Sequence, residues 1–274
     1  MRWMGFRGDV VRNSKIKFDN VDFTYTPPNG QPVKALDRVT LDVAEDEFVA
    51  IVGPSGCGKS TLLYLLGGFL PLTQGQILVN DRKVTAPGPD RGIVFQHFAL
   101  FPWKTVRQNV LYGLERKKMD ATRRQELAQK YLSLVKLTGF EDVWPAQLSG
   151  GMKQRVAIAR TLVTDPDVLL MDEPFGALDA QTRGILQEEL LAIWGSTRKT
   201  VLFVTHDVHE AVLLADRVVV MSARPGRIKT ILNVDLPRPR TPEITRSPQF
   251  VDRCQEIWDL VRGEAQAASG VTTR

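Results

Sequence analysis

The sequence is poor in the residues that build disulfide frameworks and metal clusters. It contains two cysteines, Cys57 and Cys254, and three histidines among 274 residues. Two isolated cysteines form neither a disulfide framework nor a Cys-x-x-Cys metal pair, and such usage is typical of a reducing compartment. His206 and His209 are too few for a zinc site, and no carboxylate–histidine signature surrounds them. We therefore expect neither a disulfide-stapled domain nor zinc chemistry.

Long apolar runs are also missing. No segment approaches the roughly 20 apolar residues that a membrane-spanning helix needs. Residues 1–7 lack the apolar core of a secretion signal. Any connection with a membrane is therefore expected to come through a partner. The formal net charge of +5 is compatible with polyphosphates, nucleic acid or an anionic surface, and it selects none of them.

What the sequence does contain is a phosphate-binding loop between a strand and a helix. An apolar β-type run at 48–52 leads into Gly-Pro-Ser-Gly-Cys-Gly-Lys-Ser-Thr, and a helical pattern follows at 62–66. Glycines let successive backbone N–H groups point at phosphate oxygens, while the helix presents its positive end. The lysine can reach the β- and γ-phosphates, and the serine hydroxyl after it can ligate Mg²⁺. The predicted binding residues are Gly53, Pro54, Ser55, Gly56, Cys57, Gly58, Lys59, Ser60 and Thr61.

Polar side chains follow three further apolar strands. The strand at 167–171 ends in Asp172 and Glu173. An acid at this point of a parallel sheet lies beside the phosphate loop, where it can hold Mg²⁺, and its neighbour could orient or deprotonate water. Gln96 follows the short strand 93–95 and either reaches a metal or water or only opens a loop. His206 follows the strand 200–205 and could donate to a γ-phosphate.

Other segments are open to two interpretations. Ser149 is a predicted helix N-cap, and the Gly-Gly pair after it could present bare N–H groups to an anion. The loop 98–103 is unusually apolar, which indicates either a docking surface or packing under the helices. The pattern around Tyr25 favours a core or edge aromatic, and the alternative is a stacking platform for a purine ring. Apolar residues between 250 and 261 fall on one helical face, which we expect to dock onto the body.

Together these segments resemble the ATP-binding cassette (ABC) ATPase family. The stretch 148–155 matches the signature of that family, which other phosphate-loop enzymes lack, and the order of the remaining motifs matches as well. The resemblance implies an α/β fold: a phosphate-loop NTPase core with a mixed sheet, an N-terminal antiparallel β group and an inserted α-helical subdomain. We expect the ATPase domain at 15–236, its helical subdomain at about 97–165, and a tail with one amphipathic helix at 237–274.

The same resemblance implies roles within one nucleotide site. ATP with Mg²⁺ would be the ligand, Tyr25 would stack on the adenine, and Lys59 would serve catalysis. The metal would be held or sensed by Ser60, Gln96 and Asp172. Glu173 would be the base that acts on water, with Gln96 sensing that water and His206 contacting the γ-phosphate.

A second copy of the chain, in a homodimer, is implied by the signature. Two subunits of this family face each other head to tail, so the signature of one covers the ATP of the other. The residues expected at that contact are Ser149, Gly150, Gly151 and Gln154, and Asp179 would link the two sites.

Two loops narrow the resemblance further. The segments 101–106 and 223–228 resemble those of bacterial importers of nitrate, sulfonate and taurine. This implies two membrane permease subunits, a periplasmic solute-binding protein acting indirectly, and a position on the cytoplasmic face of the inner membrane, with no nucleic acid. The expected permease contacts are Phe98, Leu100, Phe101 and Trp103. The alternatives are a soluble cassette ATPase in nucleic-acid or ribosome processes and a nucleotide-dependent regulatory module.

Overall fold

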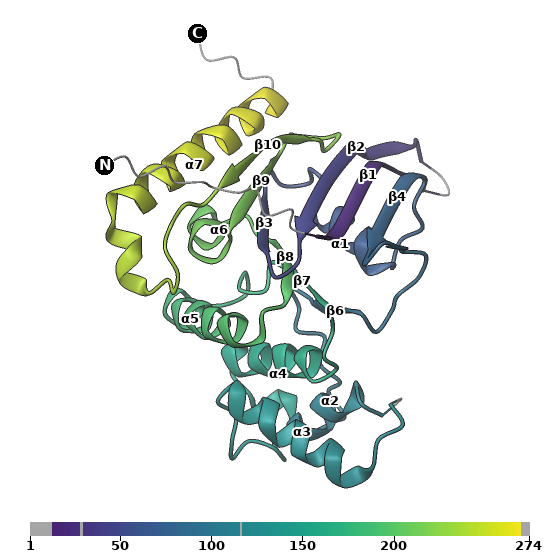
Figure 1. Ribbon diagram of the computed structural model, residues 1–274, viewed down its shortest axis with the longest axis vertical. Helices are drawn as coiled ribbons and strands as arrows, with labels where there is room; N and C mark the ends of the chain where they lie inside the picture. Colours follow the sequence, from purple (N-terminus) through teal and green to yellow (C-terminus); the bar gives the residue numbers. More distant parts are fainter. Residues whose placement is uncertain (1–12, 28–29, 116, 270–274) are drawn as a thin grey trace, which may run out of the picture.

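The computed structural model describes residues 13–27, 30–115 and 117–269. Two sheets lying side by side form its framework, and the helices pack around them (Figure 1). The antiparallel sheet has the order β2-β1-β4-β5, and the mostly parallel sheet has the order β10-β9-β3-β8-β7-β6. The strands are β1 (Ser14–Tyr25), β2 (Val33–Ala44), β3 (Phe48–Val52), β4 (Gln74–Val79), β5 (Arg82–Lys83), β6 (Arg91–Val94), β7 (Val168–Asp172), β8 (Thr200–Val204), β9 (Arg217–Met221) and β10 (Ile228–Asn233).

The central strands β3, β7, β8 and β9 of the six-stranded sheet are buried on both faces, which explains their nearly continuous apolar sequences. Strand β3 shows the division, because Phe48 and Ala50 face one core and Val49 and Ile51 face the other. One core is shared with the antiparallel sheet and α1, and the other with the remaining helices. The helices are α1 (Lys59–Gly67), α2 (Val106–Tyr112), α3 (Ala121–Leu134), α4 (Gly150–Leu162), α5 (Ala180–Thr197), α6 (Val208–Leu214) and α7 (Pro248–Ser269), with the 3₁₀ turns η1 (Pro145–Gln147) and η2 (Pro242–Arg246).

The layers place the polar strand ends together. Strands β3, β8 and β7 run parallel and adjacent, so their carboxyl ends meet at one edge of the sheet. Helices α2, α3 and α4 form a lobe below this sheet, while α7 crosses the opposite end beside α6 (Figure 1). The predicted α/β fold with an antiparallel N-terminal group and inserted helices is confirmed. In the described ranges, no helix combines the length and apolarity needed to cross a bilayer.

Two expectations about helices need correction. Helix α6 was not predicted from the sequence, although Asp207 caps it by accepting from the backbone N–H groups of His209 and Glu210. On α7, Phe250 and Ile257 are buried as expected, whereas Val251 and Trp258 remain about half exposed. The apolar face of α7 is therefore wider than the strip that docks onto the body.

Candidate active site

The phosphate loop connects β3 to α1, and two of its glycines are required by their geometry. Gly56 and Gly58 have φ values of 74° and 105°, in the left-handed region that side chains disfavour. A Cβ on Gly58 would also lie 2.7 Å from the Leu36 side chain. Cys57 between them is fully buried, and this burial raises the pKa of its thiol. Cys57 is thus a small filler of the loop rather than an exposed nucleophile.

The Lys59 side chain folds back over the phosphate loop, and its ammonium group contacts the start of that loop. Its Nζ donates to the carbonyl oxygens of Gly53 at 3.0 Å and Pro54 at 3.1 Å, and the side chain is almost fully buried. A buried cation needs such partners because desolvation of a charge is costly. The ammonium is therefore held at the loop, where phosphate oxygens would enter.

Asp172 and Ser60 meet at the end of β7, as the order of motifs predicts. The Ser60 hydroxyl donates to Asp172 Oδ1 at 2.8 Å, and the Tyr64 hydroxyl donates to Oδ2 at 2.8 Å. Burial, followed by the bond to Asp172, raises the pKa of Tyr64 to about 12. A hydroxyl beside a carboxylate is the hard-oxygen donor set that suits Mg²⁺. Tyr64 was not among the predicted site residues; it lies four residues after Ser60, which places both on one face of α1.

Glu173 forms a cluster with two of the predicted catalytic side chains. His206 Nδ1 lies 3.0 Å from Glu173 Oε2, and Gln96 Nε2 donates to the same oxygen at 3.4 Å. Glu173 itself has φ 43°, a sparsely populated conformation for a residue with a side chain. Such outliers gather at functional sites. Gln96 therefore lies beside the predicted base rather than in hydrogen-bond contact with Ser60 or Asp172.

Tyr25 stands at the mouth of the cleft, and its surroundings settle one open question. The ring is 42% exposed, which excludes the core reading that the sequence pattern favoured. Its hydroxyl shares a hydrogen bond of 3.1 Å with Thr61, and Phe23 supports the ring edge at 4.8 Å. The cleft has a volume of about 370 Å³ and is lined by Tyr25, Ala35, Ser55, Gly56, Gly58, Lys59, Ser60, Thr61, Gln96, Glu173 and Arg224.

The signature residues lie outside this cleft. Ser149 caps α4 by accepting from the Met152 N–H and is exposed together with Gly150. Ser149 and Gly151 line a separate cavity of about 300 Å³ beside Thr182. Asp179 caps α5 by accepting from the Thr182 N–H at 3.0 Å.

Gln154 differs from the other signature residues. Its side chain is fully buried, and neither amide atom has a hydrogen-bond partner among the described residues. The predicted contact with a partner's ATP therefore finds no support in its position, whereas Ser149 and Gly150 present exposed surface. A buried amide without a partner usually carries an energetic cost of about 1–3 kcal/mol.

The apolar loop predicted to dock a permease is partly exposed. Trp103 is 69% exposed, while Phe98 and Leu100 pack against the core at their inner sides. The Arg160 guanidinium donates to the carbonyls of Ala99 at 2.7 Å and Phe98 at 3.0 Å, and burial lowers its pKa. A groove of about 320 Å³ lies here, lined by Gly92, Ile93, Phe95, Ala99, Phe101, Tyr112, Gly113, Arg160, Thr161 and Thr164.

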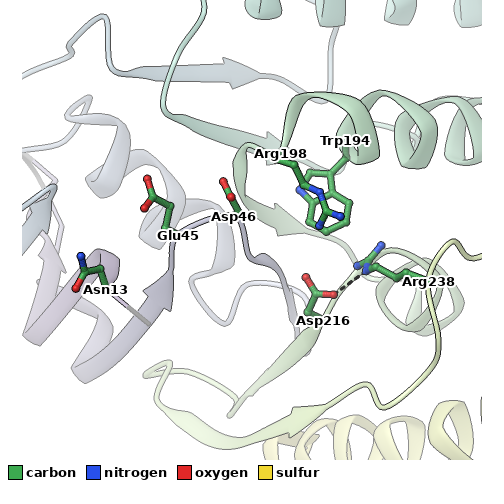
Figure 2. A pocket seen from close by; sticks show the side chains of 7 residues that line it. All are labelled: Asn13, Glu45, Asp46, Trp194, Arg198, Asp216 and Arg238. Carbon is green, nitrogen blue, oxygen red and sulfur yellow. Dashed lines mark hydrogen bonds and ion pairs between the residues drawn. The ribbon is translucent and has the colours of Figure 1, made fainter. Parts of the chain in front are cut away.

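A larger cavity of about 590 Å³ lies elsewhere, at the end of α5 (Figure 2). The Trp194 indole lies under the guanidinium groups of Arg238, 4.1 Å from the ring centroid, and Arg198 at 5.3 Å. Arg238 also pairs with Asp216 at 2.8 Å. Glu45 and Asp46 add further negative charge, which disfavours a triphosphate. The polar groups here join strands and helices, so volume alone does not identify the nucleotide site.

The fold and the cleft together define a phosphate-loop ATPase. Residues 36–176 match the family model described as ABC transporter. The chain belongs to the ABC transporter family, and it carries the ATP-hydrolysing domain of that family.

Relatives share nearly the whole chain. An uncharacterized ABC transporter ATP-binding protein of Methanocaldococcus jannaschii is 53% identical, covering 91% of this chain and 92% of its own. The nitrate import ATP-binding protein of Synechocystis sp. is 50% identical, covering 84% and 89%. The taurine import ATP-binding protein of Rhizobium johnstonii is 48% identical, covering 88% and 94%. The predicted resemblance to the nitrate and taurine branch is confirmed.

One solved structure bears on the dimer. It is a dimeric post-hydrolysis state of an ATP-binding cassette bound to ADP and phosphate, 34% identical with a TM-score of 0.70. The likeness covers 80% of this chain and 98% of that one.

Proposed function

We propose that this protein is the ATPase subunit of an importer for a small solute of the nitrate, sulfonate or taurine kind. In this proposal it acts as a homodimer on two separate permease subunits, supplied indirectly by a periplasmic binding protein, at the cytoplasmic face of the inner membrane. The observation that carries the proposal is the combination of a cleft that gathers the phosphate-loop, Gln96 and Glu173 side chains with an exposed aromatic surface at Trp103. The import functions of the nitrate and taurine relatives support it.

The side chains of the cleft account for the chemistry. Phosphoryl transfer to water depends mostly on positioning and on neutralising charge. Lys59 lies where it can neutralise the β- and γ-phosphates, and Ser60 and Asp172 would hold Mg²⁺, which neutralises charge between the phosphates when bound. In this proposal Glu173 orients or deprotonates the attacking water, and the contact of His206 Nδ1 with the same carboxylate at 3.0 Å supports a shared role. Tyr25 offers an exposed ring face to the adenine.

The second half of the site comes from the partner copy in this proposal. Ser149 and Gly150 mark the exposed start of α4, whose N–H groups and positive helix end suit a phosphate. Asp179 lies at the next helix start, where it can communicate between the two sites. ATP binding would close the dimer, and hydrolysis followed by phosphate release would open it.

The docking surface consists of Phe98, Leu100, Phe101 and Trp103 around the groove beside α2. Asn109 holds it, because its amide accepts from the Phe101 N–H and donates to the carbonyls of Phe101, Lys104 and Thr105. A rigid loop with an exposed indole suits a helix of a membrane protein that carries apolar side chains. The groove lies on the same lobe as the signature helix α4, so a movement of this lobe would reach the permease.

Co-purification tests the proposal. In detergent, the protein should co-purify with the permease encoded beside it, and Trp103→Ala should reduce both this association and solute uptake by at least about tenfold. Its ATPase activity without permease should stay within about twofold, because Trp103 lies outside the cleft. Trp258→Ala is the matched control, since Trp258 is 49% exposed on α7. Recovery with ribosomes or nucleic acid instead of a membrane protein would refute the import proposal.

A further inference from the structure

The loop between β9 and β10 returns over the phosphate loop. Gly226 donates its N–H to the Ala35 carbonyl at 2.9 Å, and its own carbonyl accepts from the Asp37 N–H at 3.0 Å. A side chain at position 226 would collide with the Cys57 carbonyl. The loop is thus joined to β2 and packed against the phosphate loop. These contacts of Gly226 hold the backbone of Arg224, which lies two residues before it.

Arg224 lies on the rim of the nucleotide cleft. Its Nε donates to the Gly56 carbonyl at 3.2 Å, and its Nη2 lies 3.3 Å from the position of a Cβ on Gly56. The side chain lines the same cavity as Tyr25 and Lys59. Within the described residues, neither terminal nitrogen has a hydrogen-bond or carboxylate partner, whereas Arg227 in the same loop pairs with Asp37. Two N–H-bearing ends of a guanidinium are therefore available at the cleft.

We propose that Arg224 is a further phosphate-binding residue of the ATP site and that α7 sets its position through Glu264. A guanidinium is permanently charged, and its planar fork matches phosphate oxygens. The bond from Nε to the phosphate loop keeps the plane of the group on the cleft side while Nη1 and Nη2 bind the nucleotide. The inference rests on ATP binding by the cassette and is independent of the import proposal.

Glu264 joins α7 to the base of this loop. Its Oε2 accepts from the Ala223 N–H at 3.2 Å, and its Oε1 pairs with Lys229 Nζ at 2.7 Å. Ala223 directly precedes Arg224, so this contact fixes the backbone from which the guanidinium extends. Helix α7 is itself anchored by the buried side chains of Phe250 and Ile257. Glu264 is therefore a positioning residue. It links the C-terminal helix to Arg224 and does not itself line the nucleotide cleft.

Titration with nucleotides of different charge tests the role of Arg224. Binding of ATP and ADP is measured directly by calorimetry with EDTA present. Binding of adenosine is measured in the same buffer by its competition with a nucleotide. Arg224→Ala should weaken ATP binding by about tenfold and ADP binding less, while adenosine binding stays unchanged, because only phosphate contacts are lost. Arg82→Ala, which removes an exposed charge on β5, is the control and should change none of the three. Unchanged ATP affinity, or an equal loss for adenosine, would overturn the proposal.

A double-mutant cycle tests the link to α7. Glu264→Ala alone should weaken ATP binding by about threefold without affecting adenosine, because the loop loses one anchor. In the Arg224→Ala background the same change should cause no further loss. The control is Glu256→Ala, since Glu256 lies on α7 and pairs with Arg253 instead of the loop. Independent, multiplying losses from Arg224→Ala and Glu264→Ala would show that Glu264 does not act through Arg224.

Discussion

The phosphate-loop cleft and the signature surface are built in opposite ways. In the cleft, the functional groups find partners in the same chain: Lys59 on loop carbonyls, Ser60 on Asp172, and His206 on Glu173. Outside the cleft, Ser149 of the signature and Asp179 cap their own helices, and the cavity beside Ser149 shares no described lining residue with the cleft.

This difference indicates which parts of the proposed site come from one chain and which come from its partner copy. The side chains proposed to bind nucleotide and metal and to supply the base all belong to one chain, because they follow adjacent strand ends. In the proposed site, the γ-phosphate is covered by the start of α4 from the partner copy, which lines a different cavity. In a head-to-tail pair of copies, the cleft of each copy would meet the signature of the other, so one contact would form two sites. A solved ATP-binding cassette that is 34% identical to this chain is a dimer bound to ADP and phosphate.

The largest expected effect comes from the base within the cleft. Glu173→Gln keeps the hydrogen-bond geometry toward His206 but cannot accept a proton, so hydrolysis should fall at least about 100-fold. ATP should still bind, and the dimer should persist because its nucleotide is not consumed. Phosphate release and light scattering with Mg-ATP measure the two effects. Glu188→Gln on the exposed face of α5 is the control, and near-normal turnover of Glu173→Gln would contradict the assigned role.

A mixture of two inactive variants tests the division between copies. Lys59→Ala disables the phosphate loop and Ser149→Arg blocks the signature, so each homodimer should have two defective sites. A mixed dimer joins both defects in one site and leaves the other intact. Random pairing should therefore restore about one quarter of the wild-type ATPase activity. The rate is measured as a function of mixing ratio, with each variant alone as control. No recovery would show that loop and signature act within one chain.

The sequence allowed the strand ends to be predicted better than their surroundings. Gly58, Lys59 and Asp172 occupy motif positions whose chemistry demands those residue types, so their meeting followed from a parallel sheet. Tyr64 could not be foreseen as a partner of Asp172, because that contact depends on how α1 lies along β7. Helix α6 was missed since its apolar run reads equally as helix or strand at such a short length.

Burial of signature and aromatic side chains was equally beyond the sequence. Gln154 belongs to a motif expected at an interface, yet the packing of α4 encloses it completely. Tyr25 ends a strand whose alternation favoured a core position, and only the arrangement of β1 beside the phosphate loop exposes its ring. Patterns along one element show which faces can be apolar, whereas neighbouring elements determine which of these faces are covered.

The smallest expected effect distinguishes capping from communication at Asp179. Asp179→Ala removes the cap of α5 and should lower the Tm by about 2–4 °C, while Asp179→Asn retains an acceptor and should keep it. The Thr182 N–H bond lowers the pKa of Asp179, so its stabilisation is complete above the unfolded pKa of about 3.9 and is lost as the pH falls through the folded value. The Tm difference between wild type and Ala should therefore shrink only in strong acid. At neutral pH, reduced ATPase activity in Asp179→Asn at unchanged Tm would show that the charge acts between the sites, whereas wild-type activity would limit Asp179 to capping.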